Sequence, residues 1–238
     1  MSRPIAAAVL ASPPDLGGWP AMSHASPAAP EVDLDQRQLR HLSKNALQRL
    51  LCEVAKTADE QTDWGQRRLL ADLERRLMLS ARVSDALFGF TRYPAPFPQR
   101  LTELAEATVE LLGDADQSIE VAVTVTGLIE AKVAASLLRI AHEMIGNAVR
   151  HGLRERAIGR IEIAVVDDAL GTRLLVCDDG WGPAAPASEG GGLAMMHDLA
   201  APMFGEVSLT REGGRTRAAL AIPRLPGGGM RWLGLMVG

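Results

Sequence analysis

The side chains best suited to binding or catalysis are concentrated in HEMIGNAVRHG, residues 142–152. Apolar residues recur at every third or fourth position along this stretch, which predicts the buried face of a helix: Leu137, Ile140, Met144 and Ala148. A second, polar face of that helix would carry Glu143, Asn147, Arg150 and His151. A carboxylate, a carboxamide and a cation in one row suit a magnesium-bound phosphate, because magnesium takes oxygen ligands and positive charge attracts phosphate.

Two glycine-rich motifs follow in the chain. DDGWG (178–182) comes directly after the strand-like run RLLVCDD, and its glycines would let the backbone turn sharply and approach a flat ligand. GGGL (190–193) stands immediately before a helix-like segment. Free backbone N–H groups and the helix dipole at such a position receive phosphate.

In this order and spacing, the three motifs make the region from about residue 100 to 224 resemble the Bergerat-fold ATP-binding domain. That domain is shared by histidine kinases, gyrase-type ATPases and anti-sigma kinases. The resemblance implies ATP and Mg as ligands, and it makes HEMIGNAVRHG the N-box. By this resemblance Asn147 would be a Mg ligand and Glu143 would polarise the reaction centre. Arg150 and His151 would lie near phosphate.

The resemblance also implies roles for the glycine motifs. DDGWG is similar to the G1 box, in which Asp178 would accept a hydrogen bond from the adenine amino group while Gly180 and Gly182 shape the pocket. GGGL is similar to the G2 box, in which Gly190 and Gly192 would close the ATP lid over the phosphates and Leu193 would belong to the ATP site. The intervening PAAPASE is shorter than the lid of many relatives.

Helical and strand patterns are mixed along this region. Helices are expected at 99–112, 131–151 and 193–203, and strands at 118–126, 159–167, 172–178, 206–211 and 215–222. The last two strands alternate on either side of a Gly-Gly turn, as a hairpin does. This mixture indicates an α+β protein whose ATP-binding part is a two-layer α/β sandwich.

An N-terminal pair of helices is expected before this domain. From residue 32 to about 58 the apolar positions recur at steps of three and four: Leu39, Leu42, Ala46, Leu50 and Val54. A second helical run begins at Trp64. A lone hairpin cannot bury an apolar stripe on both helices, so we expect it to form a homodimer with a four-helix bundle. The expected domains are a disordered tail (1–31), the hairpin (32–91), a Pro-rich linker (92–99), the ATP-binding domain (100–224) and a C-terminal tail (225–238).

The first helix contains RHLSKNALQ, with His41 beside Lys44, Asn45 and Gln48 on one side of the helix. A partly exposed imidazole near its neutral pKa is a competent phosphoryl acceptor, because its neutral form keeps one nitrogen lone pair free to attack. The pattern H-x-x-K-N-x-L-Q resembles the phosphoacceptor motif of the H-R-x-K-N-x-L-Q subgroup of histidine kinases, which is related to the HWE kinases.

The chain departs from that subgroup in three respects. Leu42 replaces the Arg that usually follows the histidine, and no acidic residue is adjacent to serve as a base. The W-x-E element of the HWE kinases is missing. No sensory domain fits into the residues before His41, so we expect the stimulus to arrive from an unknown upstream sensor or regulator.

Composition narrows the possible partners and the compartment. The net charge of −4 argues against nucleic-acid binding, which requires a basic face. No apolar run reaches the ~18 residues needed to span a membrane. The two cysteines, Cys52 and Cys177, fall in different expected domains, so we expect core packing for both rather than a disulfide. A protein that uses ATP is expected in the cytoplasm.

The sequence therefore predicts a cytoplasmic, dimeric histidine kinase of a two-component system. It would autophosphorylate on His41 with ATP-Mg and pass the phosphate to an aspartate of a response-regulator receiver domain. One alternative is a histidine phosphotransferase that relays phosphate between receivers and keeps only a vestigial ATP fold. A further alternative is an anti-sigma-type serine kinase, although such proteins usually lack a long N-terminal hairpin.

Overall fold

The computed structural model describes residues 33–89, 95–180, 191–212 and 214–224. Its core is a five-stranded sheet in the order β1-β2-β3-β5-β4. The strands are β1 (Ser118–Thr126), β2 (Ile158–Asp168), β3 (Gly171–Asp178), β4 (Glu206–Glu212) and β5 (Arg215–Pro223). β1 and β2 run parallel, and the other neighbouring pairs are antiparallel.

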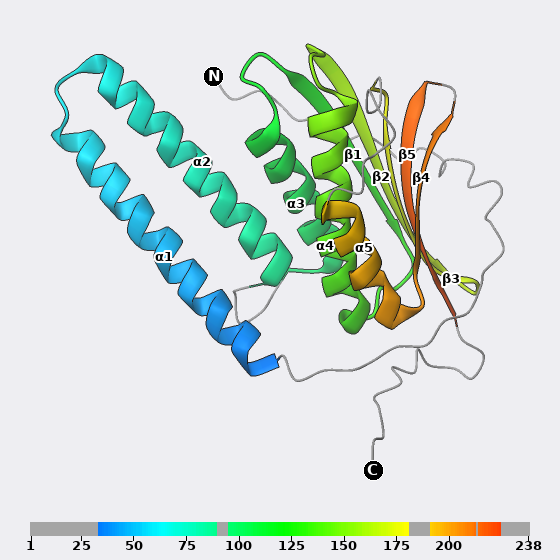
Figure 1. Ribbon diagram of the computed structural model, residues 1–238. Helices are drawn as coiled ribbons and strands as arrows, with labels where there is room; N and C mark the ends of the chain where they lie inside the picture. Colours follow the sequence, from blue (N-terminus) through cyan, green and yellow to red (C-terminus); the bar gives the residue numbers. More distant parts are fainter. Residues whose placement is uncertain (1–32, 90–94, 181–190, 213, 225–238) are drawn as a thin grey trace.

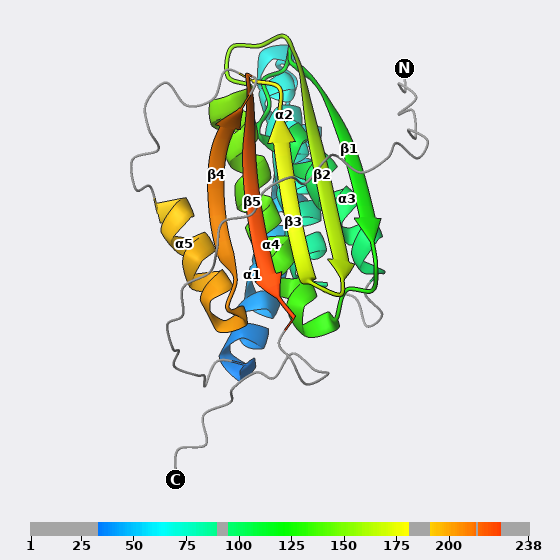
Figure 2. The same cartoon turned by 90° about the vertical axis from the view of Figure 1, so that its right-hand side faces the viewer.

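Helices cover one face of this sheet, as Figures 1 and 2 show. They are α3 (Phe97–Leu112), α4 (Ala131–Asn147) and α5 (Gly191–Ala200), with a π-helical turn η1 (Ala148–Gly152) after α4 and a 3-10 turn η2 (Ala201–Met203) after α5. The mixed sheet and its single helical layer confirm the predicted α/β architecture of residues 100–224. All five strands were placed from the sequence to within a residue at each end.

The main hydrophobic core lies between the sheet and the helices. The face that the apolar spacing predicted is buried along α4 and into η1: Leu137, Ile140, Met144 and Ala148 are all at most 5% exposed. They pack with inward-facing residues of the central strands, among them Ile161, Ile163 and Leu174. This packing fixes α4 against the sheet, so that the polar side of the helix is held in a defined place.

The helical pair before this domain consists of α1 (Asp33–Glu60) and α2 (Trp64–Phe88), which pack side by side (Figure 1). Asp63 caps α2, because its carboxylate accepts a hydrogen bond of 2.8 Å from the Gln66 backbone. α2 ends at Gly89, which adopts the left-handed conformation that glycine tolerates. The predicted hairpin is thus present in the chain, and its dimerisation remains a prediction.

α2 also packs on α3. Its residues Leu79, Val83 and Ala86 are buried. The guanidinium of Arg100 on α3 donates to the carbonyl oxygens of Ala86 and Leu87 at 3.0 and 3.1 Å. These contacts satisfy carbonyl groups at the end of α2 and attach the hairpin to the sheet domain.

The outer apolar stripe of α1 is not covered in a single chain. Leu42 is 64% exposed and Leu50 is 47% exposed. Cys52 is exposed as well, so the expectation that it packs in the core was wrong. Cys177 is half-buried against Ala164, Leu175 and Ala219, as expected. Within the described residues, no helix combines the length and the apolar character that a membrane span requires.

Candidate nucleotide-binding site

The proposed site lies where α4 and β3 both end, at the upper end of the sheet in Figure 2. β2 begins at Ile158 beside this point, because the chain returns to the sheet soon after the π-helical turn. Asp178 at the end of β3 pairs in register with Ile161 of β2 and with Thr216 of β5. The topology therefore brings the motifs HEMIGNAVRHG and DDGWG together, although about 30 residues separate them in the sequence.

The polar face of α4 is arranged around one guanidinium group. Nη2 of Arg150 lies 4.0 Å from Oε2 of Glu143 and donates a hydrogen bond of 3.4 Å to Oδ1 of Asn147. Gly192 of α5 lies next to the same group, since a Cβ atom on it would be 3.1 Å from Oε2 of Glu143. The predicted row is thus formed by Glu143, Asn147 and Arg150, with α5 beside it.

The helix changes its winding immediately after Asn147. The N–H of Leu153 donates to the carbonyl oxygen of Ala148 at 2.8 Å, five residues back, as in a π-helix. This wider turn differs from the regular helix that was predicted through residue 151. His151, predicted near phosphate, is exposed, and in the described structure it makes no hydrogen bond or ion pair with Glu143, Asn147 or Arg150.

Asp178 is buried at the base of the site, with 4% of its surface exposed. Its Oδ1 accepts a hydrogen bond of 3.0 Å from the N–H of Gly180. Burial raises the pKa of the Asp178 carboxyl group, and the Gly180 hydrogen bond partly offsets that effect. A buried carboxylate with acceptor capacity to spare is suited to receive a hydrogen bond from an amino group.

Glycines make room for the carboxylate. A Cβ atom on Gly152 would lie 2.4 Å from Oδ1 of Asp178, and one on Gly180 would lie 1.9 Å from the carbonyl oxygen of Gly152. Only a residue without a side chain fits at either position. The π-helical turn and the turn after β3 therefore meet backbone to backbone around Asp178.

Thr216 is a polar residue of the site that the sequence analysis missed. It lies opposite Asp178 on β5, and its hydroxyl helps to lower the pKa of Asp178. Even so, its buried Oγ1 has no partner of acceptable hydrogen-bond geometry among the described residues. The sequence could have indicated Thr216, because it falls on the same side of β5 as the buried residues Leu220 and Ile222. A polar, planar ligand bound beside the Asp178 carboxylate would supply a hydrogen-bond partner for this buried hydroxyl.

His142, next to Glu143, points toward α3. Its Nδ1 lies 3.1 Å from Oγ1 of Thr108, which is fully buried. Partial burial lowers the pKa of the His142 imidazole, which favours the neutral ring. We assign it a packing role rather than a place in the site.

The remaining predicted residues are placed only in part. Leu193 lies in the first turns of α5 and packs against the main core. Gly182 and Gly190 lie outside the described residues. Position 41 falls in α1, and its side chain is not described.

The residues present fit an adenine nucleotide. A buried carboxylate and an unpaired hydroxyl would meet the base, and glycines allow its close approach. Asn147 offers an oxygen atom for Mg, Glu143 offers a carboxylate at the reaction centre, and Arg150 offers positive charge for phosphate.

Comparison with known proteins agrees with this geometry. Residues 105–220 match the family described as "Histidine kinase-like ATPase domain". The matched residues include α4, α5, β1 to β4 and most of β5. No curated protein matches the sequence.

Several solved structures are similar to the chain. The histidine kinase domain of the Erythrobacter litoralis EL346 blue-light activated histidine kinase is 19% identical, with a TM-score of 0.48 over 75% of this chain and 95% of that one. A longer structure of the same kinase is 21% identical, with a TM-score of 0.49 over 74% of this chain and 59% of that one. Full-length ShkA in complex with AMPPNP is 22% identical, with a TM-score of 0.47 over 79% of this chain and 45% of that one.

Proposed function

We propose that this protein is a cytoplasmic histidine kinase of a two-component system, which uses ATP-Mg to phosphorylate His41. The observation that carries the proposal is that the cluster of Glu143, Asn147 and Arg150 and the Gly-lined Asp178 lie at the two ends of the same π-helical turn, inside the matched segment. The motif H-x-x-K-N-x-L-Q on α1 supplies the acceptor.

Each site residue has a role in this proposal. Asp178 accepts a hydrogen bond from the adenine amino group, and Asn147 would hold Mg, which would neutralise phosphate charge when bound. Arg150, which contacts Glu143 and Asn147 in the structure, would supply positive charge to the phosphates of a bound nucleotide. Gly192 and Leu193 at the start of α5 border the phosphates. The roles expected of Gly182 in shaping the pocket and of Gly190 in closing the lid stay predictions.

The proposed transfer is a substitution at phosphorus. The unprotonated imidazole nitrogen of His41 attacks the terminal phosphorus, an N–P bond forms, and the bond to the bridging oxygen breaks so that ADP leaves. The proton lost from the other imidazole nitrogen passes to a base, and Glu143 is the carboxylate that the site provides. An aspartate of a receiver domain then takes the phosphoryl group. Catalysis by positioning and charge neutralisation is typical of phosphoryl transfer.

The arrangement of the chain bears on which histidine is reached. α1 begins at the lower end of the molecule in Figure 1, and α2 and α3 separate it from the sheet, whereas α4 and β3 end at the upper end (Figures 1 and 2). The start of α1 therefore does not face the site within one chain. We propose that the domains reorient, or that the acceptor belongs to the second subunit of a homodimer built on the exposed stripe of Leu42 and Leu50.

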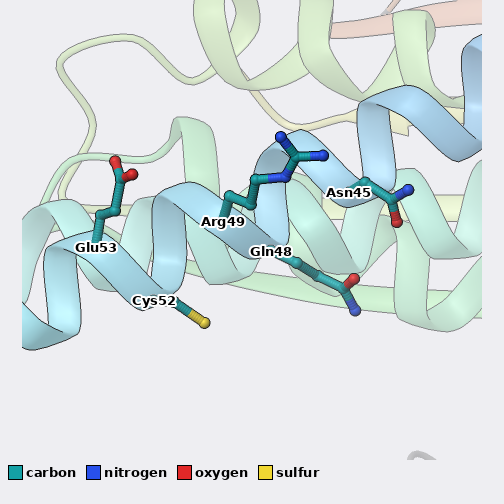
Figure 3. Close-up of a pocket in the computed structure, with 5 residues that line it drawn as sticks. All are labelled: Asn45, Gln48, Arg49, Cys52 and Glu53. Carbon is teal, nitrogen blue, oxygen red and sulfur yellow. The ribbon is translucent and has the colours of Figure 1, made fainter.

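The face of α1 that continues from position 41 is available to a receiver domain. Asn45, Gln48 and Cys52 follow at helical spacing, and with Arg49 and Glu53 they line a shallow hollow of about 440 Å³ (Figure 3). Arg49 and Glu53 point away from Gln48 and Cys52 in this view, so the charged side chains lie on a different side of α1 from these two. We propose that the receiver contacts this surface.

Nucleotide binding separates this function from its main alternative, a phosphotransferase that no longer uses ATP. Titration calorimetry of the protein with ATP and Mg should show saturable binding that Asp178→Asn weakens strongly. Absence of ATP binding, combined with phosphorylation of His41 by a phosphorylated receiver, would establish the phosphotransferase instead.

A further inference from the structure

Asp179, the second aspartate of DDGWG, is anchored to β2 rather than directed into the site. Its Oδ1 accepts a hydrogen bond of 2.8 Å from the backbone N–H of Arg160. Its own N–H donates to the carbonyl oxygen of Arg160 at 3.3 Å. Backbone and side chain of Asp179 thus extend the β2–β3 pairing by one residue beyond Asp178.

Arg156 holds the same residue from the other side. Its Nη1 donates to the backbone carbonyl of Asp179, and its Nη2 lies 3.5 Å from Oδ2 of Asp179. Its Nε donates to the carbonyl oxygen of Ile158 at 3.2 Å. One guanidinium therefore connects the segment after the π-helical turn with the turn that follows β3, which suits the several donors of arginine.

The connected turn carries the base-recognition carboxylate. Asp178 precedes Asp179, and Gly180, which donates to Asp178, follows it. The space around the carboxylate is set by Gly152 on one side and by Gly180 on the other. A shift of residue 179 would therefore displace the carboxylate and its hydrogen-bond donor together. The Arg156–Asp179 ion pair is partly buried, with side chains 28% and 34% exposed, so solvent screens it less than a surface pair.

We propose that Arg156 and Asp179 are positioning residues that set Asp178 for the exocyclic amino group of adenine, and so determine base selectivity without touching the base. This inference rests on the proposed ATP-binding function. The two residues would affect the part of the ATP affinity that comes from the adenine amino group. A purely structural role would not change that part selectively.

The test compares three ligands by titration calorimetry: ATP, inosine triphosphate, which lacks the amino group, and tripolyphosphate, which lacks the base. Arg156→Gln should weaken ATP binding about tenfold, as expected when charge-assisted hydrogen bonds are lost, with little change for the other two ligands. The preference for ATP over inosine triphosphate would then largely disappear. Asp178→Asn should remove the same preference directly.

Arg154→Gln is the matched control, because Arg154 belongs to the same loop and its side chain is 76% exposed. Among the described residues it pairs with the neighbouring Glu155 alone, at 3.6 Å. It should behave as the wild type. Asp179→Asn is a second, milder variant that keeps an oxygen for the N–H of Arg160 but loses the charge. It should weaken ATP binding about threefold with the same selectivity for the amino group. Melting temperatures close to that of the wild type would show that each variant folds.

The outcomes are distinct. Equal losses for all three ligands, or an unchanged preference for ATP in Arg156→Gln and Asp179→Asn, would overturn the positioning role while the proposed function stands. If the wild type bound no ATP, the proposed function would fail and this inference with it. A selective loss in both variants, absent from Arg154→Gln, would establish the role.

Discussion

The backbone of Gly180 lies directly against the carbonyl group of Gly152, so that a Cβ atom on Gly180 would be 1.9 Å from that oxygen. These two glycines come from motifs about 30 residues apart. Their contact joins the end of the π-helical turn to the turn after β3, directly beside the buried carboxylate of Asp178. The base end and the phosphate end of the proposed site are therefore one structural unit.

Gly180→Ala should disrupt that unit. The added methyl group would overlap backbone atoms of Gly152, which cannot yield as a flexible side chain can. We expect a loss of about 1–3 kcal/mol in the free energy of unfolding, as in overpacked cores, together with loss of measurable ATP binding. Chemical denaturation and calorimetry with ATP check the two effects separately.

Gly65→Ala provides the comparison, because its Cβ atom would meet only the carboxylate of Asp63, at 3.2 Å, far from the site. It should bind ATP as the wild type does. ATP affinity of Gly180→Ala within twofold of the wild type would show that the glycine contact does not shape the base site.

Asp178→Asn should separate stability from binding. Because burial raises the pKa of Asp178, the folded protein holds this proton up to a higher pH than the unfolded chain does. Ionisation of Asp178 therefore opposes folding at neutral pH, and that penalty disappears once the pH falls below the unfolded value of ~3.9. The asparagine variant should melt at a higher temperature than the wild type at pH 7, with a difference that shrinks toward pH 4.

The same shift predicts how ATP binding responds to pH. The ionised carboxylate is the better acceptor, so wild-type affinity should fall as acidification protonates Asp178, and should do so at a higher pH than for an exposed aspartate. A series of calorimetric titrations from pH 7 downward measures this. An Asp178→Asn variant with wild-type affinity at pH 7 would contradict the role of the carboxylate.

Hydrophobic periodicity predicted most of the fold, because each strand and helix of residues 100–224 has one face in the core. The buried face of α4 and the alternation in β5 are examples, with Leu137 and Leu220 both fully buried. The three motifs were also sufficient to bring Asp178, Asn147 and Gly192 into one hypothesis. The contact between Glu143 and Arg150 could also be expected, because both residues belong to one motif and lie on the same side of a helix.

The remaining features depend on contacts that a linear pattern does not encode. The π-helical turn is defined by one hydrogen bond, from Leu153 to Ala148, and its apolar spacing resembles that of an ordinary helix. Thr216 belongs to the site only because β5 pairs with β3 in this register. Arg156 is one of two arginines in its loop, and only the folded chain shows that it reaches Asp179.

Asn147→Ala tests the proposed metal ligand. Removing the amide oxygen should reduce affinity for ATP-Mg at least about tenfold, since even outer partners of metal ligands contribute that much. Affinity for ATP in the presence of EDTA should change far less. Asn147→Asp keeps an oxygen ligand and should retain the dependence on Mg. A variant Asn147→Ala with unchanged Mg dependence would remove Asn147 from the metal site.

The homodimer can be tested on the exposed stripe of α1. Leu42→Lys combined with Leu50→Lys would place charge where the second subunit is proposed to pack, at a cost of about 1.5–3 kcal/mol for each leucine no longer buried. Light scattering should show a dimer for the wild type and a monomer for the double variant. Leu128→Lys, at a residue that is 85% exposed in the sheet domain, should leave the mass unchanged. A wild type that is monomeric at all concentrations would contradict the dimer.

The central claim is that the ATP bound by this domain phosphorylates His41. The most direct measurement is incubation of the purified protein with Mg and γ-labelled ATP, beside His41→Ala. We expect an acid-labile, base-stable label on the wild type and none on His41→Ala, while both proteins bind ATP equally. A label that persists on His41→Ala, or a wild type that binds ATP without becoming labelled, would contradict it.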